Sequence, residues 1–232
     1  MGFEVRRRLS AADAVTLFNA VVGFVAGAVA FTDLQIAARL VLLAVIADAV
    51  DGIVARNGDS SAVGPLLDSV TDVVSFGATP SLFLYVALTN EYGGFETAGP
   101  LAFAGIALLS SAYVVCSIVR TAFYSTYFDG PDERPGMPNT LGSIIIATAY
   151  LAGVTHPLVL SGGALVLSAA MIAPFDYPKP GPMHAIPMGV VQAVAVVAPT
   201  AFHRVGPRAM LGIALLFFAL GPRYYRGDDS NN

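Results

Sequence analysis

The chain has 232 residues, of which 56% are hydrophobic and only 12% are charged. An average soluble domain carries about 25% charged residues, so this composition leaves too little polar surface to cover a water-soluble globule. The formal net charge of −4 excludes the basic footprint of a nucleic-acid-binding protein. The single cysteine, Cys116, excludes an intramolecular disulfide and a cysteine-based zinc cluster. The composition therefore predicts an integral membrane protein.

Uncharged stretches long enough to cross a bilayer recur along the chain, and backbone groups in lipid must pair within their own segment. These stretches predict an all-α, polytopic transmembrane bundle of eight helices. The expected segments are, in chain order, Ala14–Thr32, Leu34–Ala55, Val73–Asn90, Thr97–Val119, two helices within Pro135–Phe175, Pro180–His203 and Ala209–Pro222. We expect the Pro135–Phe175 stretch to break near Thr155-His156-Pro157, because proline disfavours helix in the residue before it.

The distribution of Lys and Arg predicts the orientation of the bundle. With the N-terminus inside, nine of the twelve basic residues lie in or beside cytoplasmic segments, as the positive-inside rule expects. Arg204 and Arg208 would lie outside, and Arg39 near the outer end of the second helix. We expect one domain, residues 1–226, in the cell membrane, followed by a disordered polar tail, residues 227–232.

Four aspartates interrupt the apolar segments on the predicted cytoplasmic side. Asp48 and Asp51 are three residues apart, and Asp68 and Asp72 are four apart, so each pair shares a helix face. A charged residue within a span costs roughly 2.5–3.5 kcal/mol on insertion scales, which makes such residues functional candidates. Four anions this close require positive charge between them, and carboxylate oxygens favour Mg²⁺, Mn²⁺ or Ca²⁺. The sequence therefore predicts a divalent metal site.

The residues between the aspartates suggest what this site binds. Gly52 and Ala55 remove side-chain bulk beside Asp51, and Arg56 adds a cation suited to phosphate. A polar stripe at helical spacing follows on the third helix: Asp68, Asp72, Ser75 and Thr79. This combination is typical of a diphosphate-handling site. Helix caps or ion pairs would need more cations nearby, and an ion-coupled transporter would favour carboxylates near the bilayer midplane.

One set of residues spans both aspartate pairs: Asp48, Asp51, Gly52, Ala55, Arg56, Gly64, Asp68 and Asp72. Their spacing resembles the signature of the CDP-alcohol phosphatidyltransferases, D-x2-D-G-x2-A-R-x8-9-G-x3-D-x3-D. All eight defined residues are present. Seven residues separate Arg56 from Gly64, where the signature has eight or nine; loops tolerate such deletions.

The flanking residues resemble the phosphatidylserine synthase branch of this family. The run Asp68-Ser-Val-Thr-Asp72-Val-Val-Ser75-Phe-Gly-Ala-Thr-Pro80 is similar to that branch's D-S-x2-D-x2-S-F-G-x2-P. Phosphatidylglycerophosphate synthases read D-P-x-A-D-K there, and inositol-type enzymes place a basic residue after the last Asp. Arg120 and the Gly136-Met-Pro turn also resemble the serine-using branch.

The resemblance implies homodimers with a six-helix core, here with about two added helices. Such enzymes transfer a phosphatidyl group from a CDP-linked lipid to an alcohol and release CMP. It implies Mg²⁺ or Mn²⁺, in a two-metal site, as cofactor. The implied metal ligands are Asp48, Asp51, Asp68 and Asp72, with Asp72 also the catalytic base. The implied CDP-lipid-binding residues are Gly52, Ala55, Arg56 and Gly64. The candidate acceptor-binding residues are Ser75 and Arg120.

The expected substrates are L-serine and a CDP-linked lipid, either CDP-diacylglycerol or CDP-archaeol. CDP-archaeol is expected because eleven of twelve basic residues are arginine and the pI is about 5.2, as in halophilic archaea. Inositol phosphate, glycerol phosphate or glycerol remain alternative acceptors. Prenyl diphosphate chemistry is disfavoured because no D-D-x-x-D motif occurs. An ion-coupled transporter is the non-enzymatic alternative.

Three residues have two interpretations each. Arg120 is as well explained as a snorkelling helix-end anchor, and Thr16 and Asn19 either line the nucleotide cleft or pack helices.

Overall fold

The computed structural model describes residues 9–56, 61–128, 135–177 and 182–225. Within these ranges the chain is helical, with one isolated β-bridge between Pro135 and Asp176 and no named strand. The helices are α2 Ala11–Ala30, α3 Leu34–Arg56, α4 Gly64–Asp72, the π-helical η1 Val73–Ala78, α5 Thr79–Tyr92, α6 Phe95–Ala98, α7 Pro100–Tyr127, α8 Asn139–Ala152, α9 Pro157–Met171, α10 Pro182–Val197 and α11 Ala201–Tyr225. The all-α prediction is confirmed.

Local sequence signals explain most helix boundaries. Ser10 caps α2, because its hydroxyl accepts from the Asp13 backbone while the Asp13 side chain accepts from the Ser10 backbone. The predicted break between α8 and α9 is confirmed: Gly153 adopts φ +108° at the end of α8, and Pro157 begins α9.

Four predicted boundaries were wrong by six or more residues. The third long helix begins at Gly64 instead of Val73, because α4, η1 and α5 run on without interruption through Asp68 and Asp72. The fourth helix continues to Tyr127, beyond the predicted end at Val119, so Arg120 lies within α7. The seventh helix ends at Val197 and not at His203, and the last begins before Ala209, since α11 is regular after a left-handed kink at residues 202–204. Each of these four predicted ends adjoins a charged residue, although a charged residue does not by itself end a helix.

Among the described residues, four segments are long and apolar enough to cross a membrane: Ala11–Ala30, Gly64–Tyr92, Pro100–Tyr127 and Ala201–Pro222. Helices α8 and α9 and residues 188–197 of α10 are shorter apolar helices. Helix α3 is 23 residues long but carries Arg39, Asp48 and Asp51. Many large apolar side chains on the described helices face outward, as a lipid-facing surface requires. The protein is therefore a multi-pass membrane protein.

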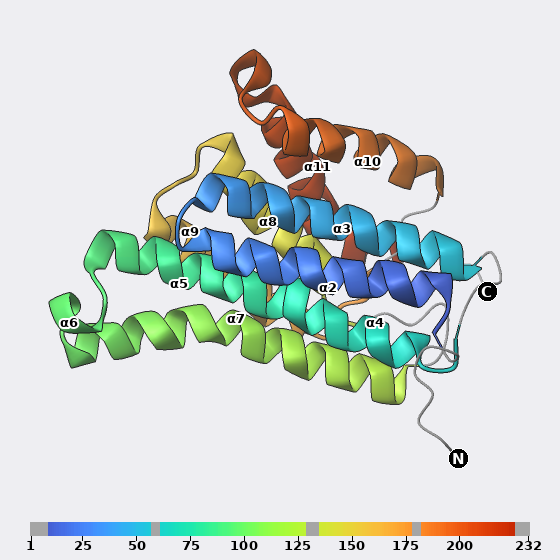
Figure 1. Ribbon diagram of the computed structural model, residues 1–232, viewed down its shortest axis with the longest axis horizontal. Helices are drawn as coiled ribbons and strands as arrows, with labels where there is room; N and C mark the ends of the chain where they lie inside the picture. Colours follow the sequence, from blue (N-terminus) through green and yellow to red (C-terminus); the bar gives the residue numbers. More distant parts are fainter. Residues whose placement is uncertain (1–8, 57–60, 129–134, 178–181, 226–232) are drawn as a thin grey trace.

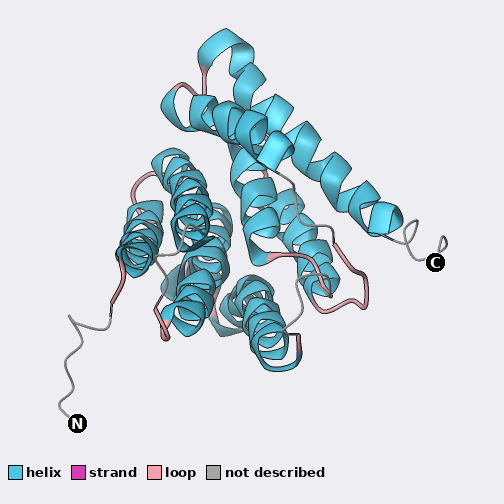
Figure 2. Ribbon diagram, turned by 90° about the vertical axis from the view of Figure 1, so that its right-hand side faces the viewer, coloured by secondary structure: helices cyan, strands magenta, loops and turns pink. Residues whose placement is uncertain are grey.

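Helices α2, α3 and the α4–η1–α5 rod pack side by side, with α7 on one side of them and α8 and α9 behind (Figure 1). The α10–α11 hairpin packs against α3 and α8, and its C-terminal helix follows one side of the bundle (Figure 2). Small residues let α2 and α3 approach closely: Ala26, Ala30, Ala37 and Ala38 are at most 1% exposed. This contact brings the N-terminal half of α2 beside the C-terminal half of α3, where Asp48 and Asp51 lie.

Gly23 of α2 tests this close packing. A Cβ atom at Gly23 would lie 2.8 Å from the backbone Cα of Ser75 in η1, whereas one at Gly105 of α7 would meet open space. We expect Gly23→Ala to destabilise the protein by about 1–3 kcal/mol, because the two backbones must separate. Gly105→Ala should be neutral or stabilise the protein by up to about 1 kcal/mol, because alanine is the better helix former. Thermal unfolding in detergent measures both, and equal midpoints would contradict this packing.

Candidate metal and nucleotide site

Three aspartates converge where α3 ends and α4 gives way to η1. Asp48, Asp68 and Asp72 each offer a carboxylate oxygen, and these three oxygens lie within 4.8 Å of one another. Asp68 is exposed, and Asp48 and Asp72 are partly buried. Helix α3 contributes Asp48 and helix α4 contributes the other two, which are one turn apart. These three predicted metal ligands are thus brought together by two helices.

The helix geometry around Asp72 is unusual. The π-helical segment η1 begins at Val73, directly after Asp72, and π-helical turns occur frequently at functional sites. Neighbouring hydroxyl groups donate to its carbonyl oxygens: Thr79 Oγ1 to Val74 at 3.0 Å, and Ser143 Oγ of α8 to Phe76 at 3.1 Å. These bonds hold the widened turn that follows Asp72.

Asp51 lies beside this cluster, but its carboxylate oxygens are not among the three that lie within 4.8 Å of one another. Its side chain is 5% exposed, and its Oδ2 atom accepts a hydrogen bond of 2.8 Å from the Thr16 hydroxyl of α2. Its charge repels those of Asp48 and Asp68. As a metal ligand, Asp51 stays a prediction. The sequence left open whether Thr16 lines the nucleotide cleft or packs helices, and its hydroxyl now donates to Asp51 between α2 and α3.

The donor set fits a divalent cation. All the converging atoms are carboxylate oxygens, which hard cations prefer. The Oδ1 atom of Asp72 is buried and has no hydrogen-bond partner among the described residues. Arg120 of α7 interacts electrostatically with Asp72, so one guanidinium faces several carboxylates there. The cluster could therefore hold a metal ion, because one arginine cannot neutralise this many anions.

The predicted CDP-lipid-binding residues lie at the end of α3 and the start of α4, the two helices that carry the cluster. Gly52 and Ala55 lie on the last turns of α3, partly exposed, and Arg56 ends that helix; the Arg56 side chain lies outside the described residues. Gly64 begins α4, where a Cβ atom would lie 3.1 Å from the Asp13 carboxylate. The small residue at 64 thus lets α4 start close to α2. Nucleotide binding by these four residues stays a prediction.

Ser75 and Arg120, the candidate acceptor-binding residues, differ in their surroundings. Ser75 is fully buried, and its hydroxyl donates to the Asn19 backbone carbonyl at 3.2 Å. This contact gives Ser75 a helix-packing role between η1 and α2. The Asn19 side chain is also fully buried, and neither of its amide atoms has a partner among the described residues.

Arg120 instead lies beside the Gly136 turn. A Cβ atom at Gly136, whose φ is +78°, would lie 3.5 Å from Arg120 Cγ. The turn is held to the end of α9 by backbone bonds from Gly136 to Phe175 (2.9 Å) and from Met137 to Ala170 (3.0 Å). The guanidinium also stacks on Tyr124, 5.0 Å from the ring centroid. The tertiary structure therefore joins Asp72, Arg120 and the Gly136 turn, which are far apart in sequence.

A model of the CDP-alcohol phosphatidyltransferase family matches residues 9–174. The chain belongs to this family. The match ends after α9, so it covers the core helices α2 to α9 and leaves the α10–α11 hairpin as the addition that the sequence predicted. Family membership confirms that the protein is a transferase enzyme, and the alternative of an ion-coupled transporter is set aside.

Curated relatives support a narrower assignment. The chain is similar to the archaetidylserine synthase of Methanothermobacter thermautotrophicus, with 29% identity over 171 residues, which cover 72% of this chain and 69% of the relative. It is 28% identical over 230 residues to the CDP-diacylglycerol–serine O-phosphatidyltransferase of Methanocaldococcus jannaschii, covering 97% of this chain and all of the relative. The Helicobacter pylori enzyme of the same name is 29% identical over 151 residues, covering 60% of this chain and 59% of the relative.

Proposed function

We propose that the enzyme transfers a phosphatidyl or archaetidyl group from a CDP-linked lipid to the hydroxyl of L-serine and releases CMP. The observation that carries the proposal is the convergence of Asp72, Arg120 and the Gly136 turn beside the carboxylate cluster. The names of the relatives, which specify serine as acceptor, support the same assignment.

Asp48, Asp68 and Asp72, with Asp51 beside them, would hold Mg²⁺ or Mn²⁺, and the number of carboxylates suits two ions. When bound, the metal neutralises the diphosphate and stabilises CMP as a leaving group. Gly52 and Ala55 leave room for the nucleotide beside α3. Arg56 would contact a phosphate, for which a guanidinium is well suited.

The reaction is a displacement at the β-phosphorus of the CDP-lipid. The serine oxygen forms a bond to this phosphorus, and the bond to the bridging oxygen breaks, so that CMP leaves with the electron pair. The proton of the serine hydroxyl passes to Asp72 as the base, whose buried Oδ1 atom has no hydrogen-bond partner among the described residues.

The charges around the cluster favour serine over a phosphorylated acceptor. Serine brings one carboxylate, which a single guanidinium such as Arg120 balances in a bidentate pair. Glycerol phosphate or inositol phosphate would bring a dianion and need further cations. Among the residues whose side chains are described, Arg120 is the basic group that interacts with the cluster.

The proposed setting is the cell membrane, with the site facing the cytoplasm and the enzyme acting as a homodimer. The positive-inside distribution supports this orientation, since it places the carboxylate end of the bundle on the side with more basic residues. The homodimer is proposed from the family resemblance alone.

The acceptor can be tested directly. Purified enzyme with Mg²⁺ or Mn²⁺ and either CDP-diacylglycerol or CDP-archaeol should release CMP on addition of L-serine, and not on addition of glycerol phosphate or inositol phosphate. Arg120→Gln should raise the KM for serine about 10- to 100-fold, because a charged hydrogen bond is lost. Rapid release of CMP with a phosphorylated acceptor and none with serine would contradict the assignment while leaving the metal site intact.

A further inference from the structure

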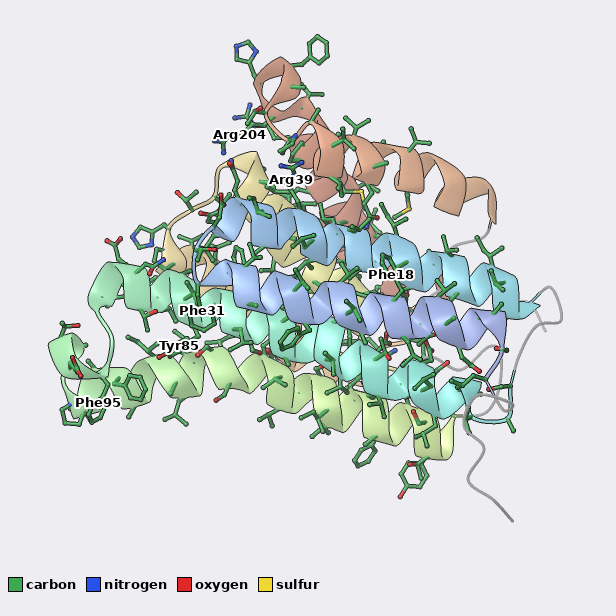
Figure 3. The ribbon with its side chains drawn as sticks, viewed as in Figure 1. Phe18, Phe31, Arg39, Tyr85, Phe95 and Arg204 are labelled. Carbon is green, nitrogen blue, oxygen red and sulfur yellow. The ribbon has the colours of Figure 1, made fainter. Side chains whose placement is uncertain are left out.

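Three arginines gather at the end of the bundle away from the carboxylate cluster: Arg39 of α3 and Arg204 and Arg208 of α11. Figure 3 shows Arg39 and Arg204 approaching the same region from different helices. Contacts support this view. Arg39 Nε donates to the Val196 carbonyl of α10 at 2.5 Å, and the α10–α11 hairpin closes a few residues later, beside Gly206.

Each guanidinium is anchored by a single backbone carbonyl. Arg204 donates to Leu151 at 3.4 Å and Arg208 Nε to Ala152 at 3.5 Å, both at the end of α8. These contacts stabilise the last carbonyl groups of α8, which lack partners within the helix. They explain in part why positive charge is tolerated at an end that the positive-inside rule predicts to be poor in arginine.

Among the described residues, these contacts use one N–H donor of each guanidinium. A guanidinium has five such donors, and within the described part of the chain no carboxylate pairs with these three arginines. Asp33 is the acidic residue at the start of α3, and its Oδ1 atom accepts from the Gln35 and Ile36 backbone. The three guanidinium groups therefore outnumber the carboxylate of Asp33 around the end of α8.

Arg204 lies in a strained stretch of backbone. Phe202, His203 and Arg204 have φ values of 47°, 57° and 65°, a left-handed run that is unfavourable for side chains other than glycine. Phe202 and Val205, which flank Arg204, are 86% and 57% exposed. Large apolar side chains thus project outward beside a partly buried cation. This combination fits the boundary between hydrocarbon and headgroups, where apolar groups and cations meet lipid together.

We propose that Arg39, Arg204 and Arg208 form a binding site for the phosphate group of an anionic membrane lipid. Guanidinium groups match phosphate oxygens in bidentate geometry, and the exposed Phe202 and Val205 would lie against the lipid's hydrocarbon. The membrane position and these apolar neighbours favour a lipid over free phosphate. The site lies at the opposite end of α3 from Asp48 and is independent of the transfer reaction.

The full-length enzyme in detergent provides the test. Phosphatidylglycerol, phosphatidylcholine or inorganic phosphate is titrated, and binding is followed by native mass spectrometry and by the thermal unfolding midpoint. We expect Arg39→Gln/Arg208→Gln to bind phosphatidylglycerol about 25-fold more weakly, about fivefold for each guanidinium removed. This variant keeps Arg204, which is partly buried against α8. Arg223→Gln/Arg226→Gln, which removes the same number of charges elsewhere in the chain, should bind as the wild type does.

Arg39→Lys/Arg208→Lys keeps the charge and serves as a second variant if the glutamine variant fails to fold. It should retain a midpoint increase with phosphatidylglycerol that phosphatidylcholine does not produce. Equal phosphatidylglycerol affinity in the wild type and the glutamine variant would overturn the proposal. An equal midpoint increase with inorganic phosphate would also overturn it, because the site would then take free phosphate. CMP release in phosphatidylcholine should be unchanged in each variant, since these residues do not touch the reaction site.

Discussion

Asp68→Asn should reduce CMP release about 1,000-fold, equivalent to about 4 kcal/mol of transition-state stabilisation. Asp68 is one of the three aspartates whose carboxylate oxygens lie within 4.8 Å. The substitution keeps the side-chain shape and removes the charge that we expect a metal ion to require. The same loss is expected for Asp48→Asn, which removes the charge that the facing helix α3 contributes to the cluster. Initial rates of CMP release measure both.

The protein should remain folded after this substitution. In the absence of metal, Asp68 repels Asp48 and Asp72, so removing its charge should leave the unfolding midpoint of the metal-free protein unchanged or higher. Glu96→Gln is the matched control, because it makes the same chemical change at an exposed position in the short helix α6. Full activity in Asp68→Asn or Asp48→Asn, or an equal loss in Glu96→Gln, would remove the carboxylate cluster from the account of catalysis.

Exhaustive chelation of divalent cations should abolish turnover altogether. The cluster concentrates negative charge, Arg120 alone interacts with it among the described basic side chains, and a diphosphate substrate brings still more negative charge. Without a divalent ion these anions would repel one another and the substrate. Adding Mg²⁺ or Mn²⁺ back to the chelated enzyme should restore CMP release, and a metal titration measures the requirement.

Metal binding should also be visible without turnover. A cation at about 100 times its Kd stabilises the folded state by about 2.7 kcal/mol, so the unfolding midpoint of the wild type should rise with added Mg²⁺ or Mn²⁺. The midpoint of Asp68→Asn should rise much less. Undiminished turnover after chelation would be incompatible with the proposed chemistry, and an equal midpoint rise in Asp68→Asn would place the cation elsewhere.

Helix spacing explains why much of the site could be predicted from the sequence. The interval between Asp48 and Asp51, and that between Asp68 and Asp72, place each pair on one face of a helix wherever that helix packs. The long uncharged stretches likewise require helices in lipid. The break before Pro157 is also local, because proline disfavours helix in the residue before it. These features depend on near neighbours in the chain, so the sequence by itself determines them.

Only the tertiary structure shows which side chains of different helices meet. Asp51 and Asp48 are equivalent in the sequence pattern, yet the packing of α2 on α3 presents Thr16 to Asp51 and leaves Asp48 to meet α4. Ser75 follows Asp72 at helical spacing, but the close approach at Gly23 commits its hydroxyl to α2.

The arginines show the same difference between what the sequence determines and what the tertiary structure decides. Composition and the positive-inside rule locate arginines along the chain, and they made Arg204 and Arg208 look misplaced. The fold brings both to the carbonyl end of α8 and brings Arg39 to the same end of the bundle. Helical periodicity is set by bonds between residues four apart, whereas the partner of a side chain depends on how helices distant in sequence pack. The sequence therefore determined the helices and the faces that carry their charges, and tertiary packing decided which of those charges meet.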